Sequence, residues 1–218
     1  MVEKECPAVV SCADILALAT RDSVVYLGGP SWEVGLRRRD STTASRLDAN
    51  NSIPAPSFSL STLKQNFANQ GVSEKDLVAL SGAHTIDLAQ CRLFGPHTYN
   101  DTNIDASYAK FLQSKCPRTG NDKLLELLDR QTPFPFDNLY YKNLAQKKVL
   151  LHSDQKLYTG DSTDHLVGNM LRIELQFFND FFEDMVKMRR IKPLTGGKKG
   201  RSDSIVLKST KHQLLKIM

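Results

Sequence analysis

The feature that most constrains the fold is a long amphipathic pattern over residues 169–191, "NMLRIELQFFNDFFEDMVKMRRI". Its large apolar residues recur every three or four positions, which places them on one face of an α-helix. They are Leu171, Leu175, Phe178, Phe182 and Met185. Few segments of the chain alternate apolar and polar residues with the two-residue period of a strand. The sequence therefore predicts a mainly α-helical protein in which this face is buried.

Capping residues predict the other helices. Ser11, with Asp14 in the first turn, is suited to start a helix that runs to about Leu27. Ser73 and Asp76 resemble a capping box, and the short helix that follows ends near His84. We further expect short helices after Ser59 or Ser61, over 87–97, after Asp105 and over 138–148, and an irregular loop over 31–58.

Composition excludes some classes of protein. No apolar run reaches the length of about 18 residues that a membrane span needs. The formal net charge is +5, but Lys187–Met218 holds ten basic residues against one acidic residue, so the rest of the chain is mildly acidic. A basic tail can bind a polyanion or can be a solvated end without a partner. Polyanion binding is therefore one of the functions that the sequence suggests.

Three positions carry chemistry that the sequence alone leaves open. His84 follows an apolar helix and is suited to bind a metal or to form a structural hydrogen bond. Asp129, Thr132 and Asp137 place oxygen ligands of the kind that calcium prefers on a proline-containing loop, although turns and helix caps explain such residues equally well. Asp154 follows an apolar pair and is suited to cap a helix.

The four cysteines also leave alternatives open. They are Cys6, Cys12, Cys91 and Cys116, and no pair has the C-x-x-C spacing, so a zinc site is not expected. An even number of cysteines is compatible with disulfide bonds, and buried thiols are the other interpretation.

Several long motifs follow one another along roughly residues 3 to 196, in the order "CPAVVSCADILALATRDSVVYLGGPSW", "IPAP", "DLVALSGAHTI", "TPFPFDNLYYKNL", "LLHSDQ" and "FFNDFFEDMVKM". These motifs and their order resemble those of the class III, or secretory, plant haem peroxidases. It implies the all-α fold of the plant-type haem peroxidases and a haem b cofactor.

The resemblance assigns roles around the haem. The histidine of "SGAHT" is the axial ligand of the haem iron in that family, so His84 is expected to be that ligand. The acid of "SDQ" corresponds to Asp154, which accepts the other ring N–H and makes the imidazole more electron-donating. The small residues Gly82 and Ala83 are expected to let the ring approach the porphyrin. Pro54 corresponds to a substrate-binding residue at the mouth of the haem channel.

The resemblance also implies a calcium site and one disulfide bond. The expected calcium ligands are Thr85, Asp129, Thr132, the carbonyl of Pro135, and Asp137. Cys91 and Cys116 correspond to a disulfide of the family, whereas Cys6 and Cys12 lack their usual partners and are expected to stay unbridged. Arg37 stands where the family usually has a glycine.

The implied activity is the reduction of hydrogen peroxide with one-electron oxidation of small phenolic donors. We expect a monomer without nucleic-acid or membrane partners, secreted as its family is, although no signal peptide is visible at the N-terminus. In the family, a distal arginine and histidine lie on helices that precede "CPAVVSCAD", and no such "RLxFHDC"-like stretch occurs here.

We therefore expect residues 1–196 to form a partial haem peroxidase domain that lacks the N-terminal distal helices, and residues 197–218 to form a divergent basic tail. The expected turnover of this chain with haem is close to that of free haem. The alternative function is that of a non-catalytic haem- and calcium-binding remnant.

Overall fold

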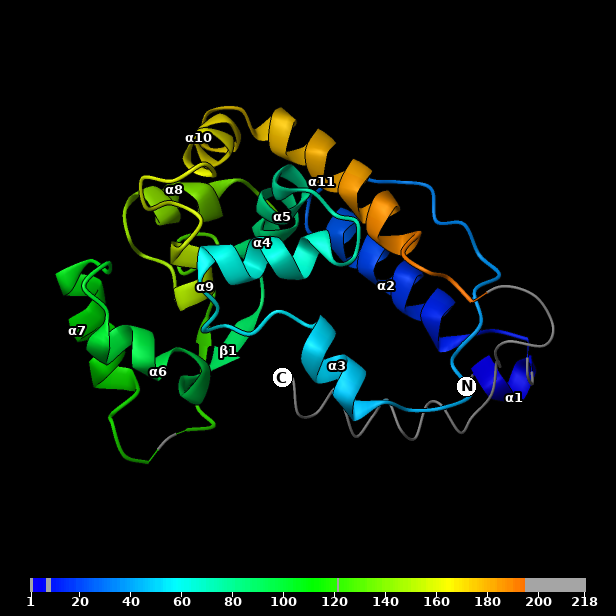
Figure 1. The fold of residues 1–218 in the computed structure, drawn as a ribbon, viewed down its shortest axis with the longest axis horizontal. Helices are drawn as coiled ribbons and strands as arrows, with labels where there is room; N and C mark the ends of the chain where they lie inside the picture. Colours follow the sequence, from blue (N-terminus) through cyan, green and yellow to red (C-terminus); the bar gives the residue numbers. More distant parts are fainter. Residues whose placement is uncertain (1, 7–8, 121, 195–218) are drawn as a thin grey trace.

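The computed structural model describes residues 2–6, 9–120 and 122–194, so the predicted tail over 197–218 lies outside the described residues. The fold is built mainly of helices, as predicted (Figure 1). The first part of the chain contains α1 (Val2–Glu5), α2 (Cys12–Tyr26), α3 (Arg46–Ser52), α4 (Leu60–Ala68), α5 (Glu74–Ser81) and the 3₁₀ turn η1 (Gly82–Thr85). The second part contains β1 (Leu88–Gln90), α6 (Cys91–Asn100), α7 (Ala106–Lys115), β2 (Leu125–Leu127), α8 (Leu139–Ala145), α9 (His152–Gln155), α10 (Asp164–Arg172) and α11 (Glu174–Arg189).

The predicted helix starts are confirmed where a side chain caps the helix. The Ser11 hydroxyl accepts a hydrogen bond from the Asp14 backbone N–H at the start of α2, and Ser59 caps α4 in the same way. Ser73 and Asp76 form a complete capping box at the start of α5. Asp105 caps α7. These caps are local interactions, which explains why the sequence predicts them well.

The long amphipathic pattern forms two helices rather than one. Ile173 has an extended backbone, with φ −129° and ψ 95°, and it separates α10 from α11. The face that α11 buries contains Phe177 and Phe181, and Leu175 is 67% exposed. The predicted face is therefore wrong by one position: Phe178, Phe182 and Met185 pack against the core but are only partly buried.

Two other predictions need correction. The segment 31–58 contains the helix α3, which Ser45 caps. The segment 87–97 begins as a strand, because β1 pairs antiparallel with β2 in the register Ala89 opposite Glu126, and only then continues as α6. A three-residue strand is too short for its two-residue period to be recognised in the sequence.

The main core surrounds α5, which packs against α4, α10 and α11. Along α5, Leu77, Val78 and Ala79 are almost completely buried. In Figure 1, α2 and α11 run beside each other on one side of this core, and α8 and α10 lie at its other end. Position 82, where α5 passes into η1, is therefore held from several sides.

A second, smaller apolar cluster joins α6 and α7. Its buried members include Phe94 and Leu112, and the disulfide between Cys91 and Cys116 lies within it, with a Cα–Cα distance of 5.6 Å. Cys6 and Cys12, in the described part of the chain, carry thiols. Among the described residues, no helix has the length and apolar character needed to cross a membrane.

Candidate functional site

The position of His84 is determined by the packing of η1 against the core. A methyl group on Gly82 would lie 2.4 Å from both the Phe177 ring and the Tyr141 hydroxyl. Glycine is therefore required at position 82 by its packing against α8 and α11, and its role in the approach to a porphyrin stays a prediction. Ala83, in contrast, lines the cavity described below.

His84 is oriented by a buried carboxylate. Its ring nitrogen Nδ1 lies 2.9 Å from Oδ1 and 3.1 Å from Oδ2 of Asp154, whose side chain is 5% exposed. The hydroxyl of the buried Tyr140 donates a second hydrogen bond to Oδ1 of Asp154, at 3.1 Å. Asp154 therefore acts on His84 and does not cap a helix: the N-cap of α9 is Leu151, which has no side-chain capping bond. An acid that accepts the Nδ1 proton leaves Nε2 as the ring nitrogen that can bind a metal.

The charge of Asp154 favours the protonated form of both of its partners. Burial disfavours the charged imidazole, but the Asp154 carboxylate outweighs this effect and raises the pKa of His84 above its ordinary value. Burial, together with the charge of Asp154, raises the pKa of Tyr140 well above its usual range, so Tyr140 remains a hydrogen-bond donor. The three side chains form one polar unit that belongs to η1, α8 and α9.

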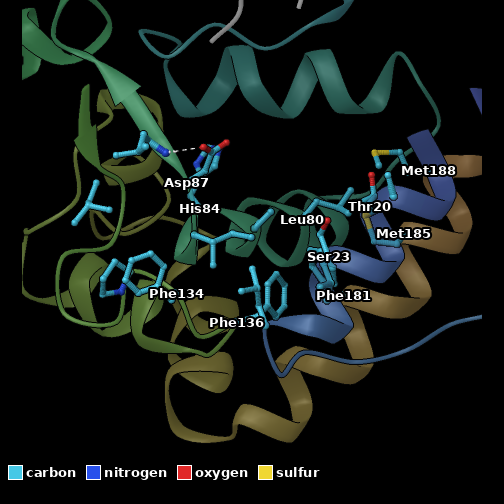
Figure 2. A pocket seen from close by; sticks show the side chains of 18 residues that line it. Thr20, Ser23, Leu80, His84, Asp87, Phe134, Phe136, Phe181, Met185 and Met188 are labelled. Atoms are coloured by element: carbon cyan, nitrogen blue, oxygen red, sulfur yellow. Dashed lines mark hydrogen bonds between the residues drawn. The ribbon is translucent and has the colours of Figure 1, made fainter. Parts of the chain in front are cut away.

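A cavity of about 730 Å³ opens beside His84. This volume is in the range of sites that hold small molecules and cofactors. Figure 2 shows His84 and Asp87 on one side of it, and Thr20, Phe181 and Met185, from α2 and α11, on the other. Most of the lining is apolar, and His84, whose side chain is 38% exposed, is its only histidine among the described residues. The cavity is therefore suited to a large flat apolar group with one coordination bond to His84.

Two of the expected calcium ligands contact each other next to His84. The Thr85 hydroxyl donates a hydrogen bond of 3.1 Å to Oδ1 of Asp137. Oδ1 of Asp129 accepts hydrogen bonds from the backbone of the turn at Gln131 and Thr132, as the turn interpretation predicts. However, Oδ2 of Asp129 and the Thr132 hydroxyl are buried without a hydrogen-bond partner.

Unpartnered buried oxygens are costly, and a bound cation would satisfy them. Burial raises the pKa of Asp129, and the nearby Asp137 carboxylate adds to this effect. The residues present therefore fit a calcium ion. Pro135 is exposed and lies on the same loop.

One predicted residue does not line the cavity, and several residues of the site were not predicted. Pro54 is exposed and does not line the cavity. Tyr140 was not predicted to be a site residue, although it belongs to "NLYYKNL", the end of one of the motifs that resemble those of the peroxidases. The sequence also gave no sign that Phe134, Phe136 and Met188 would line the cavity, because they come from segments distant in sequence.

Comparison with known proteins gives one consistent family. The model of the family described as "Peroxidase" matches residues 1–172. Peroxidase 4 of Vitis vinifera is 56% identical over 197 residues, which are 89% of this chain and 61% of that protein. Peroxidase P7 of Brassica rapa subsp. rapa is 52% identical, with 67% of its length covered. The lignin-forming anionic peroxidase of Nicotiana sylvestris is 52% identical over 196 residues, which are 61% of its length. The chain thus spans about three fifths of several of the curated relatives it matches.

Proposed function

The chain belongs to the plant secretory peroxidase family, and from this premise we propose that it binds haem b through His84 as the haem-holding part of a peroxidase. The observation that carries the proposal is the Asp154–His84 pair at the edge of an apolar cavity. Bound there, haem would supply the redox chemistry by which peroxide is reduced and a donor loses single electrons.

The residues of this chain have separate tasks in that proposal. His84 coordinates the iron through Nε2, and Asp154 holds the ring orientation and increases its basicity. The apolar side chains that α2 and α11 contribute to the cavity would exclude water from a group bound there. Calcium, held by Thr85, Asp129, Thr132, the Pro135 carbonyl and Asp137, ties the end of η1 to the loop 129–137.

The proposed substrates are hydrogen peroxide and small phenolic donors. The family as a whole supports both, and one relative is named a lignin-forming peroxidase. Pro54, on the segment between α3 and α4, is proposed to contact the donor. We also propose that the chain acts outside the cell as a monomer; the disulfide between Cys91 and Cys116 supports an oxidising compartment.

For the chain tested by itself, haem binding without rapid turnover is the second candidate. Apart from His84, no histidine or arginine of the described residues lines the cavity. General acid–base catalysis contributes about 10² to 10⁴ in rate, and it needs a side chain in reach of the bound peroxide. The rate of this chain with haem and calcium should therefore be close to that of free haem. A rate several orders of magnitude higher would show that the chain does hold such a group.

The experiment that tests the proposal is a haem titration followed by the Soret absorption band. Wild type should bind one haem with a shifted band, and His84→Ala should lose this band or change it strongly. His165, which is exposed on α10, provides the matched control. His165→Ala should keep the spectrum of wild type. If His84→Ala also binds haem with the spectrum of wild type, the ligand assignment is wrong.

A further inference from the structure

A second group of histidine and acidic side chains lies where α6 ends and α9 begins. It consists of His97, near the end of α6, Asp101, the C-cap of that helix, and His152, the first residue of α9. One ligand atom from each of the three lies within 4.8 Å of the other two. We propose that these residues bind a divalent transition-metal ion of the zinc type. The site is separate from the calcium ligands and does not depend on haem.

The hydrogen bonds of the group show why a cation suits it. Nδ1 of His97 lies 2.6 Å from Oδ2 of Asp101, and Nδ1 of His152 lies 2.5 Å from the same oxygen. Two imidazoles thus direct one nitrogen each at a single carboxylate oxygen. A divalent cation between these three atoms would be bound by two nitrogens and one oxygen, which is a common ligand set for zinc, and each neutral ring would then carry its one proton on Nε2 instead of Nδ1.

The spacing of the ligands requires only a small adjustment. Zinc–nitrogen and zinc–oxygen bonds of about 2.0 to 2.2 Å in tetrahedral geometry place the ligands about 3.3 Å apart. Each Nδ1–Oδ2 distance would have to increase by about 0.8 Å, which small rotations of the side chains can supply. Neutral imidazole together with one carboxylate favours zinc or copper over calcium, which prefers oxygen ligands alone.

The burial of the group leaves a path for the ion. The side chain of His97 is 1% exposed, and Nε2 of His97 has no hydrogen-bond partner among the described residues. The side chains of Asp101 and His152 are 26% and 25% exposed. An ion can therefore enter from the Asp101 and His152 side, and water can complete its coordination there.

The proposed ion would join two elements that lie far apart in sequence. His152 is 51 residues from Asp101, and both lie outside the cavity lined by His84. Asp154, which orients His84, follows His152 by two residues on the same short helix. A metal at His152 would therefore fix the start of the helix that carries Asp154.

The test is calorimetric titration of the full chain with zinc, without haem, in buffer near pH 7.5. Wild type should bind one zinc ion at this site, and His152→Gln should bind it at least about tenfold more weakly, since even residues that only support a ligand contribute about 10- to 100-fold. His165→Gln, the same change at an exposed histidine, should bind as wild type does. Asp101→Asn provides a second variant in case His152→Gln does not fold.

Either of two results would overturn the proposal. If wild type binds no zinc, the group is only a hydrogen-bonded link between α6 and α9. If His152→Gln and Asp101→Asn bind zinc as tightly as wild type, the ion occupies another site. Because no haem is present, neither result bears on the role of His84.

Discussion

At the scale of single residues, the side chain of Asp154 gives His84 its chemical character. A histidine at the end of an apolar helix could be recognised in the sequence, but its partner lies 70 residues further on and its orientation could not. The pairing of His84 with Asp154 was predicted only from the resemblance of the two motifs to those of the peroxidases. Tyr140, which donates the other hydrogen bond to Asp154, belonged to no site prediction, because nothing in a local pattern reveals a contact between α8 and α9.

Arg37 gives a prediction about backbone strain. Its φ is +81°, in the left-handed region, and its side chain is exposed. Residues with a Cβ are disfavoured there by about 1 to 2 kcal/mol, whereas glycine is not, although glycine loses more entropy on folding. Arg37→Gly should therefore raise the free energy of unfolding, measured in urea, by up to about 1 kcal/mol.

Arg37→Ala is the control for this change, because it removes the charged side chain and retains the Cβ. It should leave stability nearly unchanged. An equal gain in both variants would mean that the side chain, and not the backbone conformation, is the source of the effect.

At the scale of elements, the junctions between helices were the least predictable features. The caps of α2, α5 and α7 depend on residues within one turn, and the sequence predicted them. Just before the break at Ile173, the distant Asn138 side chain donates hydrogen bonds to the carbonyls of Met170 and Leu171. The strand Leu88–Gln90 likewise pairs with a distant strand, β2. The requirement for glycine at position 82 could not be predicted either, because the side chains that exclude a Cβ there, Tyr141 and Phe177, come from other helices.

Gly82 tests how closely η1 packs on the core. Gly82→Ala would place a methyl group 2.4 Å from the Phe177 ring. Overpacking of this kind costs about 1 to 3 kcal/mol, so thermal unfolding should occur at a clearly lower temperature. Gly95→Ala, on α6, meets no atom within 4 Å and should be neutral or slightly stabilising. Equal melting temperatures for the two variants would contradict the packing described.

The contact between α5 and α11 predicts a dependence of stability on pH. Burial would raise the pKa of Asp76, but hydrogen bonds from Asp184 and Lys187 lower it to about 2. Burial and the nearby Asp76 carboxylate raise the pKa of Asp184 to about 7. The contribution of Asp76 is lost as pH falls from about 4 towards 2, and that of protonated Asp184 is lost as pH rises from about 4 through 7.

Asp184→Asn should therefore become more stable relative to wild type as pH rises from 5 to 8, with the difference levelling off above about pH 7. Urea unfolding at several pH values measures this difference. Glu183→Gln, at an exposed neighbouring position, should show no such trend. A constant difference between Asp184→Asn and wild type would mean that Asp184 does not change its protonation in this range.

At the scale of the whole molecule, the cavity beside His84 is formed by elements from both ends of the described chain. The resemblance to peroxidases predicted the helical fold but not which side chains line this cavity. Helix α2, the loop 129–137 and helix α11 line one cavity. No periodicity in the sequence could have brought them together. The cluster of His97, Asp101 and His152 was not predicted for the same reason, because Asp101 and His152 are 51 residues apart.

Calcium should link the loop 129–137 to the end of η1 and so stabilise the whole chain. A ligand present at 100 times its dissociation constant stabilises the folded state by about 2.7 kcal/mol. Thr132→Val removes the buried, unpartnered hydroxyl of Thr132. With a chelator present, the variant should be at least as stable as wild type, and with calcium it should be less stable. If calcium raises the melting temperature of both proteins equally, Thr132 is not a ligand.

The central claim is that His84, held by Asp154, coordinates the haem iron, and the most direct measurement is the iron–histidine stretching band in the resonance Raman spectrum of the ferrous haem-loaded chain. Removal of the carboxylate charge makes the imidazole a weaker donor. The band should be present in wild type, shift to lower wavenumber in Asp154→Asn and be absent in His84→Ala. A band that is the same in all three proteins would contradict the account.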